Sequence, residues 1–166
     1  MLFHFQYAPD TRHYIYQMRL DIQGVDPERF RQAWQAALNA HPILRTQFLW
    51  QGDFEQPLQL VRKQLSVPFV EHDWRARDDL PAALDALADT DQQPFDLSQA
   101  PLLRLQLVRT GTTHYHLIYT HHHILLDGWS NTQLLGEIVQ RYQGSFQAGA
   151  SAGYAEYIGW LQAQEP

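Results

Sequence analysis

The sequence predicts an α+β fold in which helices cover a mixed or largely antiparallel sheet. Three features lead to this prediction. Apolar residues alternate with period two in several short segments, they recur with helical spacing in others, and turn-like connections join neighbouring strands. A doubly wound parallel sheet would instead alternate strands and helices regularly along the chain. The length of 166 residues suits one domain, or one lobe of a larger domain.

The first predicted strand and helix lie within residues 12–40. Apolar side chains alternate from Tyr14 to Ile22, which predicts a strand with one buried face. A helix follows, with Asp26 as its N-cap and Pro27 as its first residue. Its buried stripe has helical spacing and consists of Phe30, Ala33, Trp34, Ala37 and Leu38.

The residue pattern in the middle of the chain predicts three short strands and a second helix. Residues 44–50 and 58–62 are expected to pair as a hairpin, and residues 67–71 to form a further strand. The second helix begins at Pro81 and is stopped by Pro94, because proline lacks the N–H that a helix interior requires.

The residue pattern in the last third of the chain predicts a hairpin and a third helix. Residues 102–108 and 113–120 are apolar-rich strands joined by a tight turn. The helix is expected to begin after Trp129, with Ser130 and Gln133 as a capping box. Gly144 supplies its left-handed end.

Composition and charge exclude several classes of function. The net charge of -6 has the wrong sign for a surface that binds a phosphate backbone, so we expect no nucleic-acid partner. The chain has no cysteine, which excludes disulfides, thiolate metal sites and a cysteine nucleophile. No apolar run approaches the roughly 20 residues of a membrane span, and the N-terminus does not resemble a signal peptide. We therefore expect a cytoplasmic protein without a membrane partner.

A cluster of histidines is the most unusual feature of the sequence. Five of the nine histidines lie within ten residues: His114, His116, His121, His122 and His123. The last three fall where the second strand of the hairpin ends. A neutral imidazole beside a turn can accept a proton near pH 7, and backbone amides entering a helix can stabilise negative charge on a carbonyl oxygen.

Two other interpretations of the histidines remain open at this point. The three adjacent imidazoles could simply be one buried, one exposed and one peripheral side chain of a strand end. Alternatively, His114, His116 and His122 share one face of the predicted strand and could bind a divalent metal ion. The absence of nearby acidic ligands at helical spacing argues against a metal.

Residues 122–130 resemble a known family signature. They read His-His-Ile-Leu-Leu-Asp-Gly-Trp-Ser, which resembles the motif of condensation domains of nonribosomal peptide synthetases, within the chloramphenicol acetyltransferase-like superfamily. Further segments resemble other motifs of that family in the same order: residues 1–4, 41–48, 94–97, 101–104 and 154–160. In the last of these, Glu156 stands where the family usually has aspartate.

The resemblance implies roles for particular residues. His123 is the expected catalytic residue, acting as a general base or by positioning the attacking amine, and His122 is expected to pack inward. Asp127 and Gly128 complete the catalytic motif, the aspartate with a mainly structural role. Support of the site is expected from three further residues: Arg45, as the ion-pair partner of Asp127, and Trp129 and Ser130.

The resemblance also implies a fold, an activity and partners. The expected fold is a chloramphenicol acetyltransferase-like lobe, with residues 1–150 as the N-terminal lobe of a condensation domain and 151–166 as the start of the connection to a second lobe. The activity is formation of an amide bond between two thioesters on donor and acceptor carrier proteins. The phosphopantetheine belongs to these carriers, so this chain is expected to bind no cofactor or metal itself. Adjacent synthetase modules and the C-terminal lobe are further expected partners.

Two alternatives to this activity remain. An epimerisation domain shares the histidine motif, although residues 41–46 look more like a condensation domain. A non-catalytic lobe that binds carrier proteins is the other alternative. Because later family motifs are absent, we expect negligible condensation by these 166 residues alone.

Overall fold

The computed structural model describes residues 14–50 and 56–147. The resembling segments at residues 1–4 and 154–160 and the expected connection at 151–166 lie outside the described residues. None of the helices in the described part is long and apolar enough to cross a bilayer.

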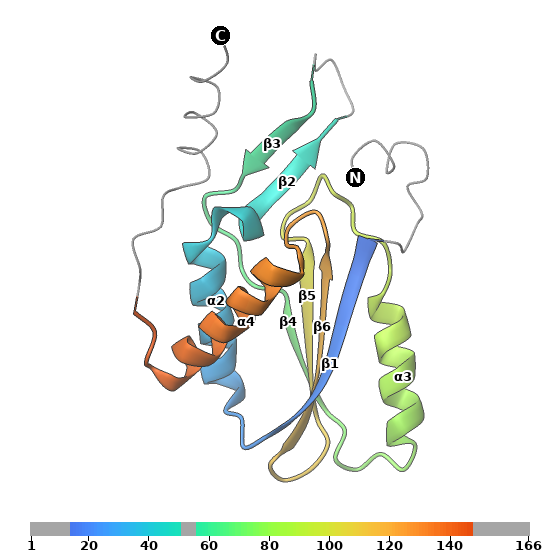
Figure 1. The fold of residues 1–166 in the computed structure, drawn as a ribbon. Coiled ribbons are helices and arrows are strands. Elements are labelled where there is room, and N and C mark those ends of the chain that lie inside the picture. The colour runs from blue at the N-terminus through green and yellow to red at the C-terminus, as the bar shows by residue number, and fades with distance from the viewer. Residues whose placement is uncertain (1–13, 51–55, 148–166) are drawn as a thin grey trace.

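A four-stranded mixed sheet forms the centre of the fold (Figure 1). Its order is β1 (Ile15–Gln23), β6 (His114–His122), β5 (Leu103–Arg109) and β4 (Phe69–Asp73). The first two pairings are antiparallel, and β4 runs parallel to β5. A separate antiparallel pair consists of β2 (Thr46–Leu49) and β3 (Leu58–Val61). The predicted α+β class and the mixed sheet are thus confirmed.

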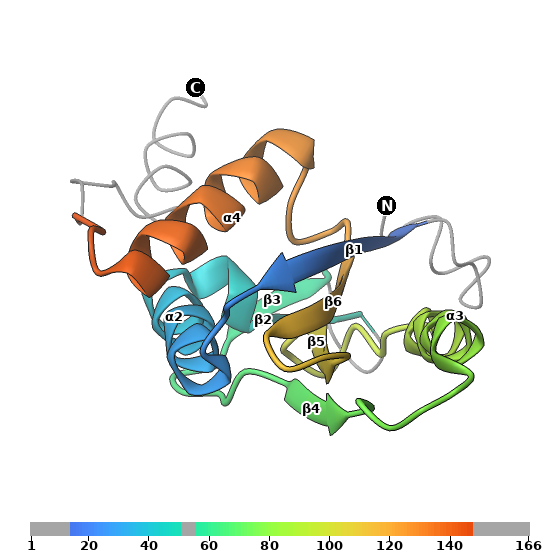
Figure 2. The ribbon, with the colours of Figure 1, turned by 90° about the horizontal axis from the view of Figure 1, so that it is seen from below.

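Helices cover both faces of the sheet (Figure 2). On one face lie α2 (Pro27–Ala40) and α4 (Gly128–Gln143), and on the other lies α3 (Leu80–Asp91). The predicted stripe of α2 is buried as expected, and Asp26 caps the helix by accepting a hydrogen bond from the Arg29 N–H. The largest fully buried side chains of the apolar face are Trp34, Tyr119, Leu38, Leu105, Leu107 and Ile138.

The start of α4 differs from the prediction. The N-cap is Asp127, whose extended backbone lets its carboxylate accept a hydrogen bond from the Ser130 N–H at 2.7 Å. The predicted capping box at Ser130 and Gln133 is therefore wrong, because the aspartate three residues earlier occupies the cap. Gly144 ends the helix in the left-handed conformation, as predicted, with φ of 77°.

Two other elements differ from the prediction, one in its bounds and one in how far its apolar face is covered. The segment expected as a strand from residue 44 begins instead with the 3₁₀ helix η2 (Pro42–Arg45), and β2 follows it. On β1, the predicted apolar face turns toward α4, but it is only partly covered. Tyr16 and Leu20 remain 51% and 42% exposed.

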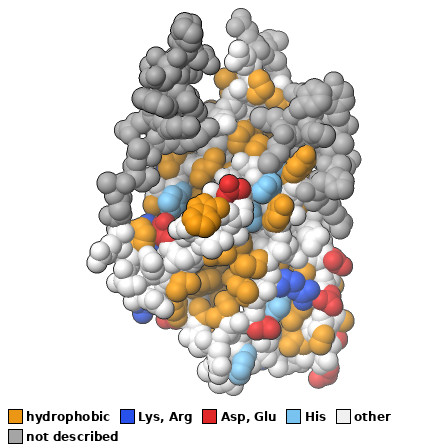
Figure 3. Space-filling model, in the orientation of Figure 1, with side chains coloured by type: hydrophobic (Ala, Val, Ile, Leu, Met, Phe, Trp, Pro, Cys, Tyr) orange, Lys and Arg blue, Asp and Glu red, His pale blue; other side chains and the backbone are white. Residues whose placement is uncertain are grey.

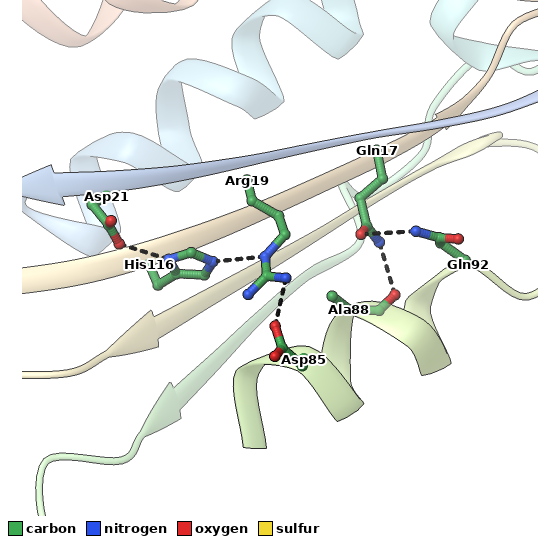
Figure 4. A network of polar contacts seen from close by, with 7 residues as sticks. All are labelled: Gln17, Arg19, Asp21, Asp85, Ala88, Gln92 and His116. Atoms are coloured by element: carbon green, nitrogen blue, oxygen red, sulfur yellow. Dashed lines mark hydrogen bonds and ion pairs between the residues drawn. The ribbon is translucent and has the colours of Figure 1, made fainter. Parts of the chain in front are cut away.

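The face beneath α3 is polar, which the sequence analysis did not predict. Gln17 of β1 donates hydrogen bonds to Thr120 and to the Ala88 carbonyl of α3, at 3.1 and 2.9 Å. Asp91 is only 5% exposed, and it accepts hydrogen bonds from Gln106 and Thr120. Figure 4 shows part of this layer, which links strands β1 and β6 to the helix.

Candidate active site

The candidate site lies where β6 ends and the chain turns toward α4. The His122 N–H donates to the Leu102 carbonyl of the neighbouring segment at 3.0 Å. The next N–H, that of His123, donates across the other edge to the Tyr14 carbonyl at 2.7 Å. Backbone hydrogen bonds from both sides therefore fix the position of this strand end.

His122 points inward, as expected. Its side chain is 2% exposed, and its ring lies near those of Tyr14 and Phe95, with centroids 6.1 and 6.4 Å away. Its Nδ1 accepts a hydrogen bond from the Ile124 N–H at 3.1 Å, which tightens the turn that carries His123. Burial lowers the pKa of His122 to about 4, so its imidazole is neutral at pH 7.

His121 lies on the opposite face of the strand, beneath α4. It is 4% exposed, and its ring stacks on Tyr119 with centroids 4.9 Å apart. Burial and the neighbouring His123 lower its pKa to about 4. Its Nδ1 is buried without a hydrogen-bond partner in the described part of the chain.

Of these three adjacent histidines, His121 and His122 are buried and His123 is partly exposed. Its ring rests against Tyr16, with centroids 4.7 Å apart. The carboxylate of Asp127 lies close enough to interact with it electrostatically. The hydrogen bond from the Ser130 backbone N–H, and in smaller part His123, lower the pKa of Asp127 below its ordinary value.

The expected ion pair between Arg45 and Asp127 does not form in this structure. The Arg45 guanidinium donates to four backbone carbonyls instead, those of Leu38, Asn39, Arg62 and Lys63. These bonds join the end of α2 to the segment after β3. Arg45 therefore supports the fold beside the site, whereas the Asp127 carboxylate caps the N-terminus of α4 by accepting a hydrogen bond from the Ser130 N–H.

A cavity of about 950 Å³ opens beside the turn that carries His123. Its wall consists mostly of apolar side chains from η2, β2, the turn and α4, including Leu44, Phe48, Leu125, Leu126 and Leu134. Ser130 lines it, and Trp129, 74% exposed, stands at its edge. Gly128 begins α4 and is exposed. In Figure 3, hydrophobic side chains gather on both sides of α4.

One polar cluster at this cavity was missed by the sequence analysis. Glu137 of α4 binds His41 at 2.7 Å and Arg141 at 2.6 Å, and it joins α4 to the start of η2. The only sequence signal was the spacing of four residues between Glu137 and Arg141 on one helix face. The contact with His41 depends on how distant segments pack.

The described residues contain no group of three or more His, Cys, Asp or Glu side chains that could hold a metal ion. Both ring nitrogens of His116, one of the histidines considered as ligands, are engaged by protein groups. Nδ1 contacts Asp21 at 2.7 Å, and Nε2 accepts from Arg19 at 3.2 Å (Figure 4).

Comparison with known proteins gives a consistent family. A family model described as Condensation domain matches residues 1–166. A linear gramicidin synthase of Brevibacillus parabrevis is 35% identical over 99% of this chain, and chondramide synthase cmdD of Chondromyces crocatus is 39% identical over 92%. The chain spans 3% and 4% of these long proteins.

Solved structures have the same fold. The tallysomycin biosynthesis protein TlmII matches with a TM-score of 0.76 and 29% identity, over 92% of this chain and 37% of that one. The starter condensation domain of rhizomide synthetase RzmA matches with a TM-score of 0.81 and 24% identity, over 98% of this chain and 42% of that one.

Proposed function

The chain belongs to the condensation-domain family of nonribosomal peptide synthetases, and from this premise we propose that it supplies the catalytic histidine, His123, for amide bond formation. In this reaction the amine of an acceptor aminoacyl thioester attacks the carbonyl of a donor thioester. The C–N bond forms, the C–S bond breaks, and the amine proton is finally carried by the released thiol.

The observation that carries the proposal is the contrast among the three adjacent histidines. His121 and His122 are buried, and their lowered pKa values keep them neutral at pH 7. His123 is partly exposed at the turn, with its backbone held by the Tyr14 carbonyl. An accessible imidazole in a fixed position suits a group that accepts or orients the proton of an attacking amine.

The substrates are proposed to arrive on two carrier proteins, each with its own phosphopantetheine arm. A structure of the related RzmA starter domain, 25% identical to this chain, was solved in complex with C8-CoA, an acyl thioester. This likeness supports thioester chemistry here. It is in keeping with a site that needs no metal or cofactor held by this chain.

The 166 residues are proposed to be inactive without the rest of the domain. The chain spans 37% and 42% of two solved structures it matches, and we propose that the remaining part of such a domain is needed to exclude water from the His123 site. A non-catalytic role, binding a carrier protein only, is the second candidate, and it is favoured by this same partial coverage.

Peptide formation from loaded donor and acceptor carriers tests the proposal. The chain is assayed alone and within a condensation domain completed by a C-terminal lobe. We expect product only from the complete domain, and a loss of about 10²- to 10⁴-fold on His123→Ala. The matched control is His114→Ala, an exposed histidine at the other end of β6, which should keep full activity.

Two outcomes would overturn the proposal. Full activity of the His123→Ala domain would remove the role of this histidine. Exchange of the substrate α-proton with D₂O, without any peptide product, would assign the site to epimerisation instead.

A further inference from the structure

A chain of ring contacts, some stacked and some tilted, connects His123 to the core of the lobe. Trp34 of α2 lies 4.9 Å from Tyr119, and Tyr119 lies 4.9 Å from His121. Tyr16 of β1 then ends this series of contacts, with its ring centroid 5.9 Å from His121 and 4.7 Å from His123. The hydroxyl of Tyr119 donates to Asn131 of α4 and ties these rings to that helix.

Tyr16 occupies an unusual place for a large aromatic side chain. It is 51% exposed, on the strand at the edge of the sheet, directly opposite His121 in the register. The same strand end also holds the backbone of His123, through the Tyr14 carbonyl. Tyr14, immediately before β1, and Tyr16, within it, therefore contact the backbone and the ring of His123 separately.

We propose that Tyr16 is a positioning residue for His123: its ring holds the imidazole in one orientation and favours the imidazole when it carries a proton. This inference rests on the proposed function of His123. The physical reason is that the face of an aromatic ring attracts a cation within about 6 Å of its centroid. If His123 acts as the base, the amine proton passes to it as the C–N bond forms, and the imidazolium later returns the proton to the departing thiolate.

The charged and titratable neighbours of His123 agree with this role. His121 and His122 are uncharged at pH 7 because burial lowers the pKa of each to about 4, so neither repels an imidazolium. The Asp127 carboxylate interacts with His123 from the start of α4. Tyr16 is thus the aromatic contact of His123 on the β1 side, and Asp127 is a nearby negative charge on the α4 side.

The first test measures the reactivity of single histidines in the 166-residue chain. Diethyl pyrocarbonate modifies accessible neutral imidazoles, and mass spectrometry of fragments gives a rate constant for each histidine. Removal of the Tyr16 ring in Tyr16→Leu should raise the rate at His123 about two- to fivefold, the factor that a contact of about 0.5–1 kcal/mol represents. Tyr16→Phe, which keeps the ring, should react like the unaltered chain.

Two internal controls separate positioning from loss of structure. Leu20→Ala removes another exposed apolar side chain from the same face of β1 and should leave His123 unchanged. His122, on the other face of β6, should stay protected in every variant. An unchanged His123 rate in Tyr16→Leu, or a rise at His122 together with His123, would overturn the proposal.

The second test uses the complete domain. Tyr16→Leu should lower kcat about two- to fivefold with little change in KM, and Tyr16→Phe should restore it. If Tyr16→Leu keeps full kcat while His123→Ala is inactive, the role of Tyr16 is wrong and the proposed function stands. If His123→Ala is itself active, the proposed function fails, and the reactivity test still decides whether Tyr16 orients the ring.

Discussion

The two faces of the central sheet differ in the kind of side chain that they bury. The face toward α2 and α4 is an apolar core around Trp34, Tyr119 and Ile138. The face toward α3 is a hydrogen-bonded layer around Gln17, Asp91 and Thr120. Apolar burial provides most of the favourable free energy of folding, whereas buried polar groups add little net stability but are destabilising when one partner is lost. The first face should therefore tolerate changes of shape poorly, and the second should tolerate loss of a single partner poorly.

The largest expected effect comes from acid, because each face carries a buried histidine whose pKa is lowered, His121 on one and His122 on the other. His121 and His122 have their pKa lowered to about 4 by burial, against an ordinary value of 6.5 in the unfolded chain. Between these values the unfolded chain binds protons that the folded protein does not. The free energy of unfolding should thus be highest above pH 6.5. It should fall by about 2–3 kcal/mol per histidine as the pH is lowered toward 4.5.

Urea unfolding at pH 7 and pH 4.5, followed by tryptophan fluorescence, measures this loss. His121→Phe should remove roughly half of the pH dependence and raise stability at pH 7, because the buried Nδ1 has no described partner. His122→Phe should also flatten the profile, but with lower stability at pH 7, since the bond to the Ile124 N–H is lost. Equal stability of the unaltered chain at both pH values would contradict the burial argument.

The apolar face is tested by Trp34→Ala. Trp34 is almost completely buried between α2 and the sheet, and truncation of such a side chain costs about 3–5 kcal/mol. The midpoint of urea unfolding should fall accordingly. Trp129→Ala is the matched control, because this tryptophan is largely exposed and its loss should change stability by less than about 0.5 kcal/mol.

The polar face is tested by Asp91→Ala. This change leaves the Thr120 hydroxyl and the Gln106 amide without their shared acceptor, and we expect a loss of about 2 kcal/mol. Asp89→Ala, on the exposed side of the same helix, should be nearly neutral. Replacing Asp91, Thr120 and Gln106 together by apolar residues of similar size should recover part of the loss, because the two donors to Asp91 are removed with it, although Gln17 and His72 then lose their bonds to Thr120 and Gln106. A triple variant as unstable as Asp91→Ala would refute this view of the layer.

The smallest effect is expected at the rim of the polar face. Arg19 and Asp85 form a partly exposed ion pair at 2.8 Å between β1 and α3. Asp85→Ala should cost less than about 1 kcal/mol at low salt, because solvent screens such pairs. The difference in free energy of unfolding between Asp85→Ala and the unaltered chain should become smaller still in about 1 M NaCl, because salt screens the pair. Urea unfolding of both proteins in parallel at low and high salt measures this difference.

The apolar face could be predicted from the sequence, and the polar face could not. Helix α2 and the β5–β6 hairpin follow from local spacing, such as the stripe that contains Phe30 and Trp34. Gln17 and Thr120, in contrast, occupy strand positions where polar residues normally indicate a face turned to water. Their burial depends on α3 crossing that face, which is a property of the tertiary arrangement.

The candidate site shows the same division. The motif identified His122 and His123, and His123 is partly exposed because β6 ends at His122 and the chain turns there. The partner of Arg45 was predicted wrongly, because the carbonyls that it binds come together only when α2 ends beside β3. The contact between Tyr16 and His123 likewise depends on the pairing of β1 with β6, strands that are distant in the sequence.

This pairing of β1 with β6 has a consequence for folding. Ile15 pairs with His122, so the edge strand can dock only after almost all of the described chain has been synthesised. Closing so long a loop is entropically unfavourable and slows folding relative to the local helices and hairpins. The His123 amide, which bonds to the Tyr14 carbonyl, should accordingly be among the last to gain protection from hydrogen exchange during refolding. The candidate site is completed at the end of folding, by the first strand of the described chain.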